Sequence, residues 1–253
     1  MMIDAHCHLE QKNYGSKLDF LLKEWKSKLK FIISSCAHPN DIEKTMWIYD
    51  KYAPFVQICI GLHPEFIGKL LVGQEEETID FIKKHKNEIV AIGEIGLDYH
   101  WIKEEKLQEE QRKLFSRLLR LAKELDKPVV IHCWEAEKDT LDILEKEGFK
   151  GRKVLLHLFQ GRKFIDRVIK NNWFVSIGPS IARSKDIKKI VRDMPLNQIM
   201  LETDSPWFKQ DGQKYGKPTN VIIPLKKIAE IKKIDVTKVE KQTDLNAKAF
   251  FNL

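Results

Sequence analysis

Ile89-Val90-Ala91-Ile92-Gly93 is a short apolar run typical of a buried strand, and Pro128-Val129-Val130-Ile131 is a second one. Between them lies a charged segment, residues 104 to 125, with leucines at positions 107, 114, 118, 121 and 125. Steps of three, four and seven residues place these leucines on one face of a helix, while the lysines and glutamates face water. The sequence from 89 to 131 therefore predicts a strand, a covering helix and a second strand.

The same unit recurs along the chain. Eight short segments rich in Ile, Val and Leu are each followed by a longer charged stretch, and eight such units in 253 residues match the size of a (β/α)8 barrel. No Pro/Gly/Ser-rich linker divides them, so residues 1–253 are predicted to form a single α/β domain, a TIM-like barrel. A doubly wound open sheet is the competing fold, but its nucleotide-binding form lacks support because no G-x-G-x-x-G motif follows a strand. The predicted strands are Met2 to Ala5, Phe31 to Ser35, Phe55 to Gly61, Ile89 to Gly93, Pro128 to Ile131, Lys153 to Leu156, Trp173 to Ile177 and Gln198 to Leu201.

Helices are predicted between these strands and after the last one. Two further amphipathic segments beyond the eighth strand are expected to close the wall of the barrel. The predicted helices are Ser16 to Leu29, Asp41 to Lys51, Glu75 to Lys86, Glu104 to Leu125, Thr140 to Lys146, Phe164 to Lys170, Lys185 to Arg192, Asn220 to Lys233 and Val236 to Phe250.

The composition indicates a folded globular protein. Hydrophobic residues make up 43% of the chain, which is enough for a substantial core. The longest apolar runs fall far short of the roughly 20 residues that a membrane helix needs. The amino terminus has no basic region followed by an apolar core, so no secretory signal is visible and a cytoplasmic location is expected. The net charge of +7 would favour the approach of a polyanion, although basic and acidic residues alternate along the helices.

Histidines fall at or just beyond the carboxyl ends of the predicted strands, where the active sites of barrels lie. His6 and His8 are two residues apart on the first strand, so both rings project from one face, which Asp4 shares. His132 and His157 end two later apolar strands, where a polar ring needs a partner. Four imidazoles that converge on one mouth of a barrel indicate a bound cation.

Carboxylates occupy the same end of the predicted barrel. Glu94 lies between Gly93 and Gly96, and these glycines let the backbone bend closely around a ligand carboxylate. Glu202 and Asp204 follow the eighth strand on one face, and two adjacent acids repel each other unless a positive charge offsets the repulsion. Imidazole and carboxylate ligands together suit zinc or manganese, and magnesium less well.

The remaining histidines divide into one candidate and three others. His63 precedes Pro64 at the end of the third strand and is predicted to act in catalysis or to contact substrate. His38 also precedes a proline but is left outside the predicted site, because it could instead begin a helix. His85 and His100 are expected on the surface, on a charged helix and a loop.

Six motifs, in the same order and at matching spacing, resemble the TatD family of metal-dependent deoxyribonucleases. The resemblance runs from residue 3 to about residue 250. It implies a TIM-like barrel of the amidohydrolase superfamily and metal-dependent hydrolysis of DNA phosphodiester bonds, often from the 3′ end. The motifs are Asp4-Ala5-His6-Cys7-His8, Gly61-Leu62-His63-Pro64, Gly93-Glu94-Ile95-Gly96-Leu97-Asp98, Pro128-Val129-Val130-Ile131-His132, His157-Leu158-Phe159-Gln160-Gly161 and Glu202-Thr203-Asp204-Ser205-Pro206.

The resemblance also implies a role for each matching residue. Two divalent metal ions (Zn, Mn or Mg) would be bound, and Glu94 would bridge them. His63 and Glu202 would lie close to the substrate and the reactive water, and Asp204 would accept the proton of that water. The implied ligands are His6, His8 and Asp204 for one ion, and His132 and His157 for the other.

Two positions depart from the family pattern. The family usually carries an arginine two residues after the histidine of the fifth strand, where this chain has Trp134, and Leu158 replaces a cysteine. The change to Trp134 removes a bidentate clamp on phosphate, although an indole can stack on a base. Arg162 on the adjacent loop is expected to supply the missing positive charge.

Two alternatives to a deoxyribonuclease remain open. One is a metal-dependent hydrolase of the same barrel class that acts on a carboxyl ester or amide, for example a deacylase of aminoacyl-tRNA. The other is a barrel that binds nucleic acid or a partner without catalysis. For the main hypothesis, DNA is the expected substrate, no membrane or obligate protein partner is expected, and the chain is expected to be a monomer.

Overall fold

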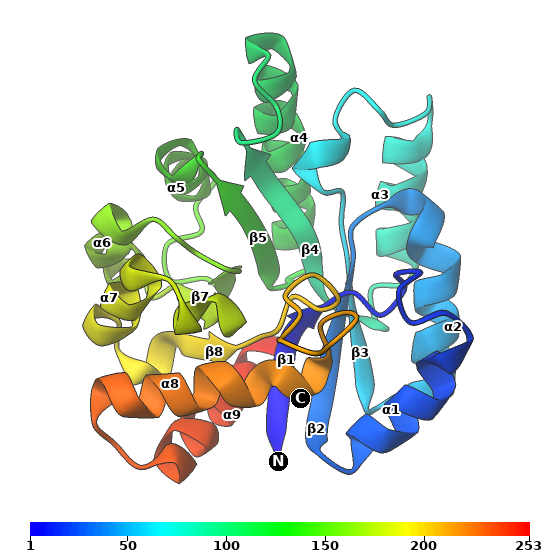
Figure 1. The fold of residues 1–253 in the computed structure, drawn as a ribbon. Helices are drawn as coiled ribbons and strands as arrows, with labels where there is room; N and C mark the ends of the chain where they lie inside the picture. The colour runs from blue at the N-terminus through cyan, green and yellow to red at the C-terminus, as the bar shows by residue number, and fades with distance from the viewer.

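Eight parallel strands form the centre of the computed structural model, which describes all residues 1–253 (Figure 1). They are hydrogen-bonded in chain order, from β1 to β8, and helices follow them in alternation. The predicted (β/α)8 barrel is confirmed. The strands are β1 (Met2–Cys7), β2 (Leu29–Cys36), β3 (Val56–Ile60), β4 (Ile89–Asp98), β5 (Val129–Trp134), β6 (Val154–Leu156), β7 (Phe174–Ile177) and β8 (Ile199–Leu201).

The helices begin and end within a few residues of the predicted positions. In α4, Leu114, Leu118 and Leu121 of the predicted leucine stripe are buried against the strands. None of the helices combines the length and the apolar character that crossing a bilayer requires. They are α1 (Leu18–Lys26), α2 (Ile42–Tyr52), α3 (Gln74–Lys84), α4 (Glu105–Glu124), α5 (Glu137–Lys146), α6 (Ile165–Lys170), α7 (Lys185–Asp193), α8 (Ile222–Lys232) and α9 (Val236–Phe251).

Two backbone hydrogen bonds join the segment after β8 to β1 and draw the ends of the sheet together. The Asp204 N–H donates to the carbonyl of His6 at 3.0 Å, and the His8 N–H donates to the carbonyl of Ser205 at 2.8 Å. Residues that are almost two hundred positions apart in the chain are thereby fixed side by side, which sets Asp204 beside both histidines.

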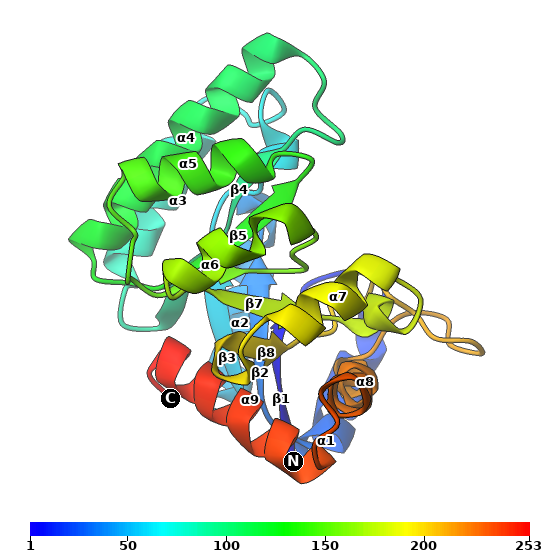
Figure 2. The same ribbon diagram turned by 90° about the vertical axis from the view of Figure 1, so that its left-hand side faces the viewer.

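The last helix closes one end of the barrel rather than its wall, which corrects the prediction for residues 236 to 250. Ala247, Phe250 and Phe251 of α9 pack into a buried cluster with inward-facing strand residues such as Ile3 and Val130. Figures 1 and 2 show α9 at the end of the strands where the amino terminus lies. Apolar side chains therefore fill the barrel at the amino-terminal ends of the strands. The polar groups lie at the opposite end, where the carboxyl ends of the strands meet.

Strand β4 extends five residues beyond its predicted end at Gly93. Glu94 therefore lies within the strand, next to a register shift between Ile92 and Ile95. Gly96 has a φ of +145°, and a Cβ at this position would lie 2.0 Å from the carbonyl oxygen of His132 on β5. Only glycine allows β4 and β5 to approach so closely, which explains the glycine after Glu94.

A second irregularity affects β1. Regular alternation predicted that Asp4 shares a face with His6 and His8, and this prediction is wrong. A register shift lies between Asp4 and Cys7. The Asp4 carboxylate accepts hydrogen bonds from the backbone N–H and the hydroxyl of Thr203 instead, so it fastens β1 to the segment after β8.

Candidate metal centre

The carboxyl ends of the strands surround a cavity of about 480 Å³. Five of the six predicted metal ligands line it: His8, Glu94, His132, His157 and Asp204. His6, the sixth, is 1% exposed and lies against them. The structure therefore brings together all six side chains that were predicted to meet.

One group of donor atoms lies between β1 and the segment after β8. His6 Nε2 and His8 Nε2 are 3.3 Å apart, and Asp204 Oδ1 lies 3.7 Å and 3.3 Å from them respectively. Glu94 Oε2 adds a fourth donor, 3.4 Å from His6 Nε2 and 3.6 Å from His8 Nε2. Four donors in a tetrahedron, each about 2.1 Å from an ion, lie about 3.4 Å from one another. The donors of His6, His8 and Asp204, which lie 3.3 to 3.7 Å from one another, therefore have a spacing that suits a divalent ion such as zinc.

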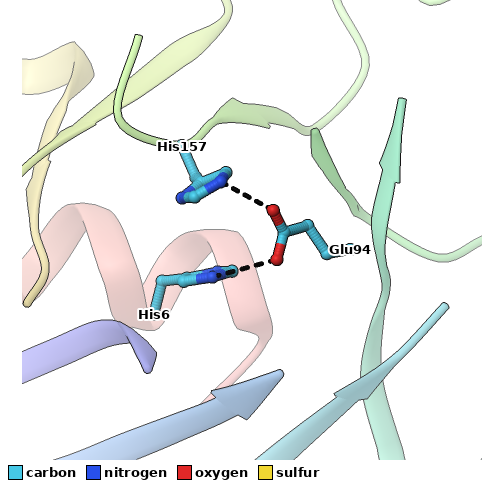
Figure 3. Close-up of side chains that lie close together, drawn as sticks. All are labelled: His6, Glu94 and His157. Carbon is cyan, nitrogen blue, oxygen red and sulfur yellow. Dashed lines mark ion pairs between the residues drawn. The ribbon is translucent and has the colours of Figure 1, made fainter. Parts of the chain in front are cut away.

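The second group shares Glu94. Its other oxygen, Oε1, lies 2.7 Å from His157 Nε2 and 2.9 Å from His132 Nδ1, and these two nitrogens are 3.4 Å apart. Figure 3 shows the two oxygens of Glu94 turned toward different rings, Oε2 toward His6 and Oε1 toward His157. Three protein donors would leave room in the cavity for water or substrate, as in catalytic metal sites.

Hydrogen bonds on the far side of the rings fix which nitrogen faces each group. His8 Nδ1 lies 2.8 Å from the carbonyl of Ser35, so its N–H donates a hydrogen bond there and Nε2 is free to bind metal. His132 Nε2 lies 2.8 Å from Asp98 Oδ2, which leaves Nδ1 for metal. Asp98 was missed as a functional residue, although Glu94, Gly96 and Asp98 alternate along one face once β4 is extended.

Glu202 occupies a comparable outer position beside His157. It is fully buried, and its Oε2 faces His157 Nδ1 at 3.6 Å; neither atom has a hydrogen-bond partner. Its other oxygen accepts a hydrogen bond from the Leu158 N–H at 2.8 Å. Glu202 thus lies behind the ring of His157 and is absent from the cavity wall.

His63 lies on the cavity wall beside the second group. Its Nδ1 accepts a hydrogen bond from the Glu65 N–H at 3.1 Å, so the neutral ring carries its proton on Nε2, which lies 3.3 Å from Glu94 Oε1. Burial, together with the neighbouring His132, lowers the pKa of His63 below its ordinary value. His63 is therefore a neutral N–H donor aimed at the centre of the site.

The titration of the other groups reflects the mutual attraction of acids and imidazoles. Burial opposes charge on His157, but Glu94 and Glu202 outweigh it and raise its pKa well above the ordinary value. Burial likewise opposes the ionised Glu94, but the charge of His157 and the hydrogen bonds of His132 and His157 hold its pKa well below the usual range. The site thus favours ionised carboxylates and needs positive charge, which protons or metal ions can supply.

The two residues predicted to contact substrate have different surroundings. Trp134 lines the cavity, whereas Arg162 is exposed on a short turn (Arg162–Phe164) and is not among the lining residues. The expected supply of charge from Arg162 to the cavity wall is therefore not seen. Two histidines outside the predicted site also lie close to it: His38 lines the cavity, and His100 stacks on Trp134.

The barrel and its paired donor groups define a metal-dependent hydrolase of the TIM-barrel class. A family model described as TatD related DNase matches residues 3–252, so the chain belongs to the TatD family, as the sequence motifs predicted. The deoxyribonuclease TATDN3 of Homo sapiens is 34% identical over 99% of this chain and 94% of its own length. The uncharacterized metal-dependent hydrolase YabD of Bacillus subtilis is 30% identical over 100% of both chains.

Solved structures of this family share the fold. YJJV, a TatD homolog from Escherichia coli, has a TM-score of 0.89 and 22% identity, with 100% of this chain and 98% of that chain covered. A TatD family hydrolase from Entamoeba histolytica has a TM-score of 0.86 and 21% identity, with 98% and 97% covered.

Proposed function

We propose that this chain is a deoxyribonuclease that hydrolyses phosphodiester bonds of DNA from the 3′ end, with two divalent ions as cofactors. The observation that carries the proposal is the position of Glu94, whose two oxygens reach two different groups of imidazoles. A carboxylate so placed is suited to bridge two ions. The names of the relatives, deoxyribonuclease and metal-dependent hydrolase, support the reaction class.

Ions bound there would supply positive charge that activates a water and stabilises the developing charge on phosphate oxygens. His6, His8 and Asp204 would hold one ion, His132 and His157 the other, with Glu94 shared between them. Asp204 lies on the cavity wall, where its carboxylate can accept a proton from the attacking water.

His63 and Glu202 are assigned separate tasks. His63 Nε2–H donates a hydrogen bond to an oxygen of the phosphate, and its lowered pKa keeps the ring neutral for this task. Glu202 acts through His157, whose ring it holds in place, and is therefore a positioning residue.

A monomer in a reducing compartment such as the cytoplasm is the proposed working state. All donors of both groups come from one chain, so no second copy is needed to complete the site. The four cysteines are unpaired and buried, which suits a compartment that keeps thiols reduced.

Replacement of Glu94 tests the proposal. Glu94→Gln is expected to lower the metal content in elemental analysis and to abolish hydrolysis of 3′-labelled single-stranded DNA in manganese. Glu88→Gln, a half-exposed glutamate just before β4, is the control and keeps both. Undiminished hydrolysis by Glu94→Gln would remove Glu94 from the mechanism.

A second candidate is hydrolysis of a carboxyl ester or amide, as in a deacylase of aminoacyl-tRNA. It is favoured by one observation: no lysine or arginine lines the cavity. A substrate whose reacting bond carries no phosphate does not need such a cation. Parallel assays of the wild-type protein on aminoacyl-tRNA and on DNA separate the two candidates.

A further inference from the structure

The cavity wall carries no lysine or arginine. Its charged side chains are acids, among them Asp41, Glu65 and Asp98, and its other titratable groups are histidines and Cys133. A nucleic acid that enters the cavity therefore finds no lysine or arginine for the phosphates beyond the reacting one. Recognition of the substrate must use other groups.

Aromatic side chains are the groups that the wall offers instead. Trp101, Trp134 and Trp207 line the cavity and are 60%, 37% and 55% exposed respectively. Large exposed indoles gathered around one cavity are uncommon on a soluble domain and mark a binding surface. Base faces stack on such rings regardless of sequence.

Trp134 is the indole best placed for this task. It follows the metal-binding His132 by two residues on β5, so both side chains face the same side, about 7 Å apart along the strand. The Tyr99 N–H donates to the Trp134 carbonyl at 2.9 Å, which fixes the backbone at the end of the strand. A phosphate at the metal groups and a base at Trp134 would be separated by about the breadth of a sugar.

The ring of Trp134 is held in place before any ligand binds. The imidazole of His100 stacks on it with ring centres 4.2 Å apart and planes within 4°. His100 Nδ1 in turn lies 2.8 Å from Glu135 Oε1, and the Trp101 indole stands at 80° to that of Trp134. The stack covers one face of the indole, and a fixed platform loses little conformational entropy when a base stacks on its exposed part.

We propose that Trp134, supported by His100, is a specificity-determining residue that stacks on an unpaired nucleobase next to the reacting phosphodiester. A base in a duplex has both faces covered, so a stack on Trp134 requires an unpaired base. This inference rests on the proposed deoxyribonuclease function and names the part of the substrate that the cavity recognises.

Binding to two oligonucleotides of equal charge tests the inference. One is a fluorescein-labelled thymidine hexamer with phosphorothioate linkages, which resist hydrolysis; the other has the same backbone without bases. Fluorescence anisotropy with the purified, metal-containing protein gives Kd for each. Trp134→Ala is compared with Trp134→Phe, which retains an aromatic face, and with Trp47→Ala, a 48% exposed indole on α2 outside this cavity.

The wild-type protein is expected to bind the thymidine hexamer more tightly than the base-free one. Trp134→Ala weakens binding of the thymidine hexamer about 5-fold to 100-fold, the range for loss of one base stack, and leaves the base-free hexamer unchanged. Trp134→Phe retains most of the affinity, and Trp47→Ala retains all of it.

Equal wild-type affinity for the two hexamers would overturn the inference, and so would a folded Trp134→Ala protein that binds the thymidine hexamer as the wild type does. Hydrolysis of an ordinary oligonucleotide is measured separately and tests the proposed function. Stacking without hydrolysis would contradict the proposed function alone, and hydrolysis without discrimination between the hexamers would contradict the stacking alone.

Discussion

His132 Nε2 lies 2.8 Å from Asp98 Oδ2, on the edge of the imidazole opposite to Nδ1, which faces Glu94. Asp98 is fully buried and also accepts a hydrogen bond from the Trp101 N–H at 2.7 Å, so the carboxylate itself is fixed. The pair determines the tautomer of His132 and the direction of its ring. Such outer carboxylates make a histidine a better ligand.

Asp98→Asn is therefore expected to weaken metal binding at the second group about 10-fold to 100-fold. The amide keeps the shape of the side chain but removes the charge that stabilises a donating Nε2–H. Titration of the metal-free protein with manganese or zinc in a calorimeter measures the effect. Asp80→Asn, on the exposed surface of α3, is the control, and an unchanged affinity in Asp98→Asn would contradict the role.

His63→Asn separates hydrogen-bond donation from metal binding. His63 Nε2 carries a proton that faces Glu94, so His63 is a hydrogen-bond donor rather than a metal ligand. We therefore expect the variant to keep its metal content. Its kcat is expected to fall about 100-fold to 1000-fold, which is the cost of removing one donor to a developing negative charge. His38 is the control, because its Nδ1 likewise accepts a hydrogen bond from the backbone N–H two residues later. His38→Asn is expected to keep the kcat of the wild type. Loss of metal from His63→Asn would instead identify His63 as a ligand, as its closeness to Glu94 and His132 permits.

The barrel and the gathering of histidines and carboxylates at one end of it could be predicted because both follow from local pattern. Each apolar run with its charged helix is a separate signal, and a polar residue at the end of an apolar strand, such as His157, stands out. The six side chains that the structure gathers at the carboxyl end of the barrel were predicted together for this reason. The spacing along each strand was enough to place His6 with His8, and the parallel order of the strands placed them near Asp204.

The residues that were missed or misplaced depend on contacts between strands. Asp98 lies beyond the predicted end of β4, and only the close pairing of β4 with β5 at Gly96 extends the strand that far. The position of Asp4 depends on a register shift in β1, which no periodicity reveals. His100 was expected to be a surface residue on a loop, and its stacking on Trp134 was missed because that contact joins the ends of two different strands.

The pH dependence of stability in the metal-free protein follows from the shifted pKa values. His8, His132 and His157 have raised pKa values in the folded protein. Their contribution to the free energy of unfolding is therefore fully present below about pH 6.5 and is lost as the pH rises through the raised values. Glu94 and Asp98 have lowered pKa values, so their contribution is present above about pH 4.5 and is lost on acidification. The metal-free protein is therefore expected to be most stable between about pH 4.5 and pH 6.5.

Metal binding is expected to have the opposite trend, because ions replace the protons on these rings. The rise in Tm on addition of zinc or manganese grows from pH 5.5 to pH 8. Thermal unfolding with and without chelator at a series of pH values measures both trends. A metal-free Tm that increases steadily up to pH 8 would contradict the assignment.

Gly96→Ala tests whether the close approach of β4 to β5 positions both halves of the site. The new Cβ would lie 2.0 Å from the His132 carbonyl, and a φ of +145° is unfavourable for alanine, so the strands must separate. We expect a loss of about 4 kcal/mol or more in the free energy of unfolding, together with weaker metal binding, because Glu94 and His132 lie on the two strands that move apart.

Gly151→Ala is a matched control: its φ is +73°, but nothing lies within 4 Å of the added Cβ. It is expected to cost only about 1 to 2 kcal/mol, the penalty of a left-handed backbone, and to leave metal binding intact. Equal losses in the two variants, measured by urea unfolding, would show that backbone conformation alone requires the glycine at position 96.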